Sequence, residues 1–170
     1  MQPLELYIHI PFCVKKCAYC DFLSGPAGEK EKEEYVKMLV DEIRNCPDPV
    51  QNYRVISIFF GGGTPSLLTG EQIGRLMDTV REIFTLDEDA EITMEMNPGT
   101  VTEEKLRKYR QAGVNRLSIG LQSVNDEELR LLGRIHTYEE FLEAYHLARA
   151  NGFSNINVDL ISAIPGQTVE

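Results

Sequence analysis

The sequence LYIHIPFCVKKCAYC, residues 6–20, joins an alternating apolar and polar segment to a cysteine-rich loop near the start of this 170-residue chain. The alternation over Leu6–Ile10 is typical of a strand with one buried face. The loop that follows carries Cys13, Cys17 and Cys20 at a spacing from which three thiolates can converge on one soft metal centre. Three thiolates are one fewer than a closed four-cysteine site contains. If the metal is an iron–sulfur cube, one iron therefore stays open to another ligand.

Zinc binding and simple burial are the two other interpretations of this loop. A zinc ion would need a fourth ligand, which His9 or Asp21 could supply, but structural zinc sites usually have two separated ligand pairs, and the chain has no second pair. The charged Lys15 and Lys16 between the cysteines make an apolar cluster a poor explanation. Iron–sulfur binding therefore ranks first and zinc second. The isolated Cys46 receives no role.

Composition and charge exclude several classes of function. With 42% hydrophobic and 26% charged residues the chain has the composition of one soluble globular domain. Its net charge is −10, and it has no cluster of lysines and arginines of the kind that binds phosphates, so no nucleic-acid partner is predicted. No apolar run is long enough for a transmembrane helix, and the N-terminus does not resemble a signal peptide. We expect a cytoplasmic protein whose thiols stay reduced.

Strand-like and helix-like segments alternate along the chain. Strands are predicted over Leu6–Ile10, Val55–Phe60, Ile92–Met96, Arg116–Gln122 and Asn155–Ile161. Helices are predicted over Glu29–Asn45, Gly70–Phe84, Thr102–Ala112, Asp126–Leu132 and Tyr138–Asn151, with Ser24–Glu29 as the least structured loop. Thr102 is a capping residue at a helix start, and Gly113 and Gly152 mark helix ends. Repeated βα units predict a parallel sheet with right-handed crossovers, and hence an α/β fold.

The predicted strands alternate in polarity, whereas strands buried on both faces read as continuous apolar runs. In Ile92–Met96, for example, Thr93 and Glu95 face away from the apolar residues. Because unpaired buried polar groups are costly, the polar face should line a solvated cavity that holds a ligand, with helices on the other face. An open antiparallel sheet with one face in water is the alternative, and the βα alternation argues against it.

Further candidate residues lie where predicted strands end. Gly61–Pro65, GGGTP, directly follows a strand, and its glycines would let a ligand approach the backbone at the edge where parallel sheets bind ligands. The lysine of a phosphate-binding P-loop is absent. Polar candidates on the polar faces or just beyond them are Glu95, Gln122, Arg134 and Asp159. His136 has no independent argument, and a surface or supporting role fits it equally well.

These motifs together resemble the radical S-adenosylmethionine (SAM) proteins. The resemblance rests on Tyr7–Phe12 before CxxxCxYC, on Gly61–Pro65, on Glu95 in MEMNP, and on Gly120–Ser123, Gly133–Thr137, Asn157–Leu160 and Pro165–Thr168. Within that family the chain is similar over essentially its whole length to the oxygen-independent coproporphyrinogen III oxidase-like group. The resemblance implies a partial (β/α)6 barrel, a [4Fe–4S] cluster held by Cys13, Cys17 and Cys20, and SAM on the open iron.

The same resemblance implies roles for single residues. Tyr7, Gly62 and Glu95 match contacts to the cluster-bound SAM, while Gly63, Thr64, Gln122, Arg134 and Asp159 match contacts to a second SAM, and Tyr19 matches an aromatic residue of the cluster loop. A porphyrinogen or heme is the implied partner, with heme as a further ligand. An electron donor such as flavodoxin or ferredoxin is implied as well.

Two departures from the oxidase pattern favour a heme-chaperone branch of this group. Asp21 and Phe22 follow Cys20, where the oxidase loop continues with glycine and a fourth cysteine, and the chain lacks the N-terminal extension of the oxidase. We therefore expect a cluster- and SAM-dependent heme chaperone, which leaves enzymatic activity open. The alternatives are a true oxidase, which decarboxylates porphyrinogen propionates through a 5′-deoxyadenosyl radical, and a zinc-bound module without radical chemistry. Only five strands precede Glu170, so residues 1–170 are expected to form an incomplete radical-SAM core domain whose sixth strand and C-terminal region are absent.

Overall fold

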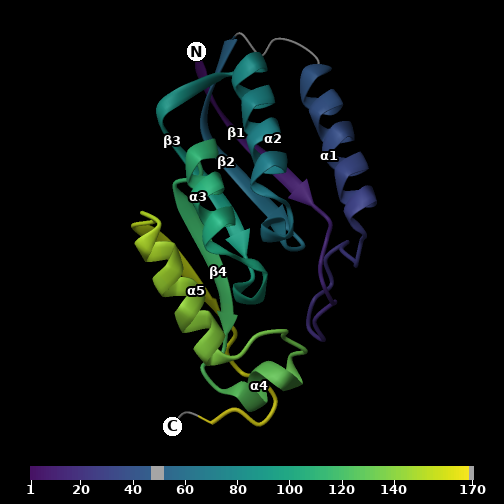
Figure 1. The fold of residues 1–170 in the computed structure, drawn as a ribbon, viewed down its shortest axis with the longest axis vertical. Helices are drawn as coiled ribbons and strands as arrows, with labels where there is room; N and C mark the ends of the chain where they lie inside the picture. Colours follow the sequence, from purple (N-terminus) through teal and green to yellow (C-terminus); the bar gives the residue numbers. More distant parts are fainter. Residues whose placement is uncertain (47–51, 169–170) are drawn as a thin grey trace.

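A computed structural model, which describes residues 1–46 and 52–168, shows a parallel α/β architecture (Figure 1). The strands are β1 (Gln2–Ile10), β2 (Tyr53–Gly62), β3 (Thr85–Met96), β4 (Arg116–Gln122) and β5 (Asn155–Leu160). They form one sheet in the order β1-β2-β3-β4-β5, and every neighbouring pair is parallel. The predicted fold class is confirmed. Glu170, which ends the predicted domain, lies outside the described residues.

Helices connect successive strands and lie on one side of the sheet. They are α1 (Glu29–Arg44), α2 (Gly70–Ile83), α3 (Glu103–Ala112), α4 (Asp126–Leu131) and α5 (Tyr138–Ala150), with short 3-10 segments η2 (Pro65–Leu67) and η3 (Pro98–Thr100). Figure 1 shows α1, α2, α3 and α5 in a row over the sheet, while α4 lies beyond the end of β4. The predicted signals at α3 are confirmed: Thr102 Oγ1 accepts a hydrogen bond from the Lys105 N–H, and Gly113 ends the helix at φ +110°.

Most element bounds agree with the predictions to within two residues, and the exceptions are the starts of β1 and β3. These strands begin at Gln2 and Thr85, whereas the predictions begin at Leu6 and Ile92. The added residues are largely polar, so no apolar alternation announces them. They are strands because their backbones pair with the start of β2, where Gln2 faces Tyr53.

The hydrophobic core fills the space between the sheet and the helices. The apolar residues that alternate along the strands are buried there, among them Ile8, Ile10, Ile58, Phe60, Met94, Met96, Leu117 and Ile119. They pack with Ile73, Leu76 and Met77 of α2. The opposite face of the sheet carries Glu95, Ser118 and Asp159, as the alternation predicts. Among the helices that the structure describes, none has the length and apolar character to cross a bilayer.

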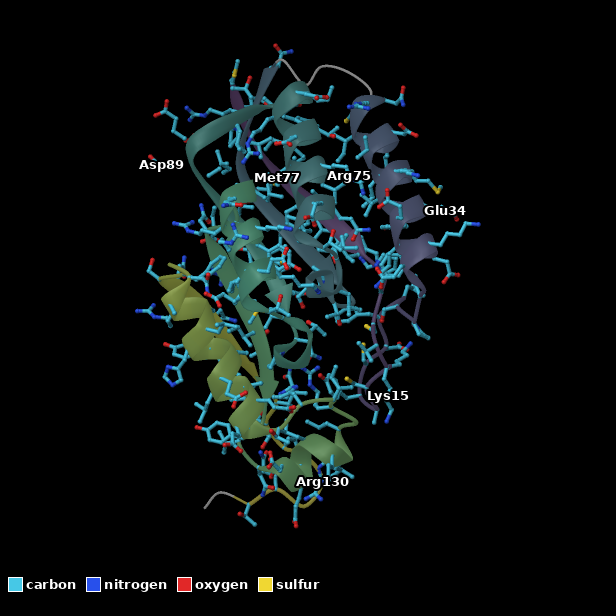
Figure 2. All side chains as sticks on the ribbon, viewed as in Figure 1. Lys15, Glu34, Arg75, Met77, Asp89 and Arg130 are labelled. Atoms are coloured by element: carbon cyan, nitrogen blue, oxygen red, sulfur yellow. The ribbon has the colours of Figure 1, made fainter. Side chains whose placement is uncertain are left out.

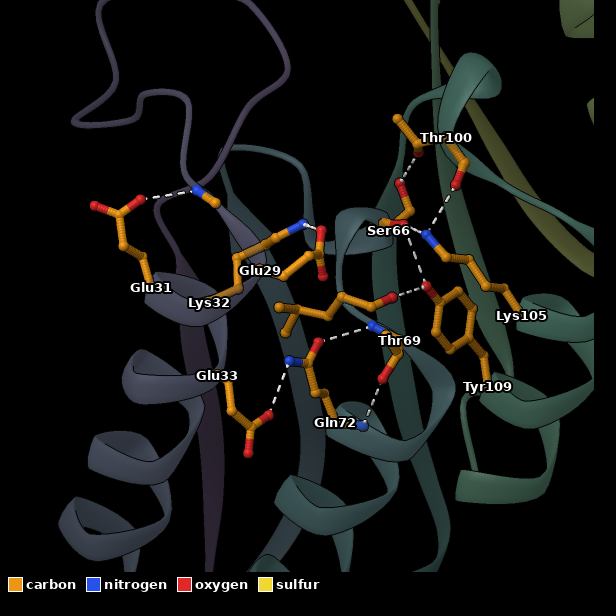
Figure 3. Close-up of polar contacts among 12 residues, drawn as sticks. Glu29, Glu31, Lys32, Glu33, Ser66, Thr69, Gln72, Thr100, Lys105 and Tyr109 are labelled. Carbon is orange, nitrogen blue, oxygen red and sulfur yellow. Dashed lines mark hydrogen bonds and ion pairs between the residues drawn. The ribbon is translucent and has the colours of Figure 1, made fainter.

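Polar contacts fix the segment that leaves β2, as Figure 3 shows for η2 and its neighbours. The buried Tyr109 hydroxyl donates to the carbonyl oxygens of Leu68 at 2.5 Å and Ser66 at 3.2 Å. Lys105 Nζ donates to the carbonyl oxygens of Ser66 at 2.8 Å and Thr100 at 3.1 Å. Side chains of α3 therefore hold the chain immediately after the glycine-rich end of β2. Burial raises the pKa of Tyr109, so its hydroxyl stays protonated as a donor.

Candidate functional site

A cavity of about 240 Å³ opens at the carboxyl end of the sheet, and residues on or directly after all five strands line it. Of the twelve predicted site residues, eleven line this cavity: Cys13, Cys17, Tyr19, Cys20, Gly62, Gly63, Thr64, Glu95, Gln122, Arg134 and Asp159. The cysteine loop and the region around α4 lie at the same end of the molecule, where Figure 2 labels Lys15 and Arg130. The topology explains this convergence, because the carboxyl ends of parallel strands meet at one edge of the sheet.

Backbone hydrogen bonds close the base of the cysteine loop. The Cys13 N–H donates to the Gly25 carbonyl at 2.9 Å, and the Gly25 N–H donates to the Pro11 carbonyl at 3.0 Å. Further along the loop, the Ala18 N–H donates to the Leu132 carbonyl at 2.9 Å. The loop is therefore attached to its own stem and to the turn that follows α4. Its apolar residue Phe22 is 64% exposed and lines the cavity.

The three loop cysteines are free thiols, partly exposed, and line the same cavity. Within residues 1–46 and 52–168, no group of three or more His, Cys, Asp or Glu side chains is close enough to hold one metal ion. Thiolates are the ligands that iron–sulfur clusters take, so the three free thiols on this cavity fit such a cluster.

The glycines of GGGTP have a structural reason besides ligand access. Gly62 has φ +111°, and a Cβ there would lie 2.5 Å from the His9 ring. A Cβ on Gly63 would lie 2.6 Å from the Phe12 carbonyl oxygen. The absence of both side chains lets the end of β2 pass directly against β1 and the cysteine loop. This close passage places the Thr64 hydroxyl 3.6 Å from Cys13 Sγ.

Two carboxylates face the cavity in different environments. Glu95 Oε2 accepts the Gly62 N–H at 3.0 Å. Burial raises the pKa of Glu95, the Gly62 N–H opposes that shift, and the negative charge of Asp159 adds to it. Asp159 accepts hydrogen bonds from Ser118 Oγ at 3.0 and 3.2 Å and from Asn157 Nδ2 at 2.7 Å. Both carboxylates are thus held in place, with acceptor positions available for hydroxyl or ammonium groups.

Arg134 brings a positive charge to the same cavity. Its Nη2 donates to the Gly120 carbonyl at 2.7 Å, and its Nη1 lies 3.4 Å from the Tyr19 hydroxyl and 3.7 Å from Cys17 Sγ. Its Nε is buried and has no partner among the residues described. A buried donor without a partner is costly, so this N–H is a natural contact for a bound acceptor such as a carboxylate.

Gln122 ends β4 in an unusual backbone conformation. Its φ is +73°, and the pairing of β4 with β5 shifts register between Gly120 and Gln122. Residues other than glycine rarely adopt a positive φ, and such backbone strain concentrates at functional sites. Gln122 also lines the cavity, so the irregular backbone lies at the site.

Tyr7 is the one predicted site residue that does not line the cavity. It is 60% exposed, its hydroxyl lies 3.1 Å from His9 Nδ1, and its ring stacks on Phe59. With His9 and Tyr35 it lines a separate hollow beside α1. Burial and, second, the charge of Glu95 raise the pKa of Tyr7.

His136 and two polar residues lie outside what the sequence predicts. His136 is buried at 4% exposure, lines no part of the cavity, and neither ring nitrogen has a hydrogen-bond partner in the described structure. Burial and then the charge of Arg134 lower the pKa of His136 to about 4. Ser118 and Asn97 line the cavity but were not predicted. The alternation of β4 would have identified Ser118, whereas Asn97 follows a strand end and carries no periodic signal.

Comparison with known proteins agrees with this geometry. The profile of the Radical SAM superfamily matches residues 7–170. The chain is 48% identical over its whole length to the heme chaperone HemW of Escherichia coli (strain K12), of which it covers 45%. It is 41% identical to HemW of Haemophilus influenzae, again over its whole length and over 46% of that protein.

A solved structure is similar over nearly the whole chain. Coproporphyrinogen III oxidase (HemN) from Escherichia coli, a radical SAM enzyme, matches 98% of the chain at 37% identity with a TM-score of 0.88. The match covers 39% of that oxidase chain. The chain thus spans less than half the length of these relatives.

Proposed function

The chain belongs to the radical SAM superfamily, and from this premise we propose that it is the cofactor-binding part of a heme chaperone. The observation that carries the proposal is the convergence of three free thiols, two carboxylates and a guanidinium on one cavity at the carboxyl end of the sheet. Membership of the superfamily implies a [4Fe–4S] cluster and SAM. The identity of 48% to a heme chaperone supports the cellular role.

In this proposal Cys13, Cys17 and Cys20 would hold the cluster and leave one iron open to SAM. The chemistry that a bound cluster would supply is the one-electron reduction of SAM. The chain's own residues bind and orient the nucleoside. Glu95 and Asp159 offer acceptors to hydroxyl or ammonium groups, and both carboxylates are already oriented by the hydrogen bonds described above.

Further residues complete the proposed binding set. Tyr7 and Gly62 are assigned with Glu95 to the cluster-bound SAM, and Tyr19 to the cluster loop. Gly63, Thr64, Gln122, Arg134 and Asp159 are assigned to a second SAM. The unpartnered Nε of Arg134 supports its assignment to a carboxylate. Tyr7 does not line the cavity, so its assignment rests on its match to the family motif alone.

Heme delivery is proposed over oxidase activity because of the residue at position 22. Phe22 stands there, exposed and lining the cavity, where the loop of the oxidase group carries a fourth cysteine. We propose heme as the partner, a one-electron carrier of the flavodoxin or ferredoxin type as the electron donor, and the cytoplasm as the location. We further propose that residues 1–170 are the larger part of a (β/α)6 core domain in a longer protein.

A coproporphyrinogen oxidase is the second candidate, supported by the TM-score of 0.88 to HemN. The two functions differ in what happens to a porphyrin. A chaperone binds heme and gives a Soret band without changing coproporphyrinogen. An oxidase decarboxylates the propionates of coproporphyrinogen and consumes SAM.

The test is anaerobic reconstitution of the protein with iron and sulfide, followed by EPR spectroscopy of the reduced cluster with and without SAM. A change in the EPR signal on adding SAM is expected, because SAM would bind the open iron directly. Heme addition and coproporphyrinogen turnover are then measured on the same sample. Stoichiometric zinc with no acid-labile sulfide would contradict the proposal and favour the zinc-bound module.

A further inference from the structure

We propose that Thr64 and Arg134 donate hydrogen bonds to two of the three cluster-binding sulfurs and thereby raise the reduction potential of the cluster. This role rests on the proposed function, because it requires Cys13 and Cys17 to be cluster ligands. It is separate from any contact that either side chain makes with SAM. Thr64 and Arg134 would act as positioning and tuning residues through the sulfurs.

The first contact joins Thr64 to Cys13. Thr64 Oγ1 lies 3.6 Å from Cys13 Sγ, within hydrogen-bond distance for sulfur, and a threonine hydroxyl can donate to a thiolate. The Thr64 backbone is held on both sides, because its N–H donates to the Phe12 carbonyl at 2.7 Å and its own carbonyl accepts the Leu67 N–H at 2.9 Å. With 8% exposure, Thr64 has little freedom to turn its hydroxyl toward water.

The second contact joins Arg134 to Cys17 across more than a hundred residues of sequence. Arg134 Nη1 lies 3.7 Å from Cys17 Sγ, and Nη2 is fixed by its 2.7 Å hydrogen bond to Gly120. The Ala18 N–H donates to the Leu132 carbonyl, so a backbone hydrogen bond also joins the cysteine loop to the segment that carries Arg134. Gly133, at φ +75°, turns the chain just before Arg134, and an added Cβ there would make only an ordinary contact with Cys17 Cα at 3.7 Å.

The three sulfurs therefore differ in their surroundings. In the part of the chain that the structure describes, Cys20 Sγ receives no side-chain hydrogen bond, whereas Cys13 faces a neutral hydroxyl and Cys17 a guanidinium. Hydrogen bonds to ligating sulfurs and nearby positive charge stabilise the more negative, reduced cluster, and this raises its potential. A charged donor has the larger effect, so Arg134 should contribute more than Thr64.

The experiment measures the midpoint potential of the reconstituted cluster by dithionite titration with redox mediators, monitored by EPR without SAM. The test variants are Arg134→Gln and Thr64→Val. Arg130→Gln is the matched charge control, because Arg130 lies on α4 and its Nε donates to the Asp126 carbonyl at 3.1 Å, not to sulfur. Thr64→Ser is the matched hydroxyl control.

We expect Arg134→Gln to lower the equilibrium constant for one-electron reduction about tenfold, which is a shift of about 59 mV to more negative potential. Thr64→Val should shift the potential in the same direction by less. Arg130→Gln and Thr64→Ser should keep the wild-type potential. A loss of packing alone would reduce cluster content without moving the potential of the loaded fraction, so iron and sulfide are quantified for every variant.

Unchanged potentials in loaded Arg134→Gln and Thr64→Val would overturn the inference and leave the proposed function intact. An equal shift in Arg130→Gln would also overturn it, because the effect would then be one of overall charge. If Arg134→Gln takes up no cluster, Thr64→Val carries the comparison, with Thr64→Ser as its control. A wild-type protein that takes up no cluster contradicts the proposed function and this inference together.

Discussion

Gly62 shows how one residue sets the approach of two strands. Its φ of +111° disfavours any side chain, and a Cβ would also displace the His9 ring. We expect Gly62→Ala to lower the free energy of unfolding by about 2 kcal/mol or more, from backbone strain and the displaced ring together. Urea denaturation measures the change.

Gly74→Ala is the matched control for that substitution. Gly74 lies within α2, and a Cβ there meets nothing within 4 Å. The same exchange should stabilise the protein by about 0.5–1 kcal/mol, because alanine favours the helix. Equal effects of the two substitutions would contradict the account given for Gly62.

Cys17 and Cys46 offer a direct comparison of two free cysteines. Cys17 lines the cavity, whereas Cys46 is exposed and outside it. We expect Cys17→Ser to abolish cluster uptake, because the two remaining thiolates can bind only two of the irons. Cys46→Ser should bind iron and sulfide as the wild type does. The measurement is iron and acid-labile sulfide per chain after anaerobic reconstitution, and normal uptake by Cys17→Ser would refute the assignment.

His136 makes stability depend on pH. Burial lowers its folded-state pKa to about 4, below the value of 6.5 for an unfolded histidine. Below about pH 6.5 the unfolded chain binds a proton that the folded chain does not, so stability is fully present above pH 6.5 and is lost as the pH falls toward 4. The loss amounts to about 2–3 kcal/mol. Denaturation of wild type and His136→Gln at pH 7.5, 5.5 and 4.5 checks it, since the variant should lose less stability on acidification, and parallel losses would argue against this role.

At the scale of elements, α3 holds η2 through Tyr109. Removing its hydroxyl in Tyr109→Phe leaves two carbonyl oxygens, those of Ser66 and Leu68, without this donor. We expect a loss of about 1–3 kcal/mol in the free energy of unfolding, which thermal or urea denaturation measures. Tyr138→Phe, in α5, is the control and should change stability by much less. A negligible effect of Tyr109→Phe would show that η2 is fixed without it.

The residues of a strand predict its polar face but not always where the strand begins. Alternation identified which face of each strand is polar, because a period of two fixes side-chain direction regardless of the fold around it. It could not find the start of β3 from Thr85, where the acidic Asp87 instead forms an ion pair with Arg54 at 2.9 Å. That contact comes from a neighbouring strand, and nothing within β3 itself signals it.

The candidate site was predictable for a related reason. In a parallel sheet the carboxyl ends of all strands lie at one edge, so residues at or after these ends lie close together. Glu95, Arg134 and Asp159 accordingly line one cavity. Tyr7 was harder to place, because β1 is an edge of the described sheet and its polar face has a neighbouring strand on one side only. The burial of His136 depends on how the segment after α4 packs, which no local pattern encodes.

For the whole molecule, residues from or directly after all five strands line one cavity. Cys13 follows β1, Gly62 ends β2, and Glu95, Ser118 and Asp159 lie on β3, β4 and β5. A ligand that binds only the folded chain stabilises it, by about 2.7 kcal/mol at a hundred times its Kd. We therefore expect SAM to raise the unfolding temperature of the anaerobically reconstituted protein.

Two variants test this stabilisation at a fixed SAM concentration. Glu95→Gln and Asp159→Asn should each reduce the increase in unfolding temperature, because each weakens an acceptor in the cavity. Lys30→Gln, on the exposed surface of α1, should retain it. An equal increase in all three variants would place SAM elsewhere.

The closed stem of the cysteine loop separates the anchoring of the loop from its thiol groups. Its base is joined by backbone hydrogen bonds between Cys13, Gly25 and Pro11, and the three thiols are partly open to solvent. None of these backbone hydrogen bonds uses a sulfur, so replacing a cysteine side chain would remove a donor atom and leave the stem closed.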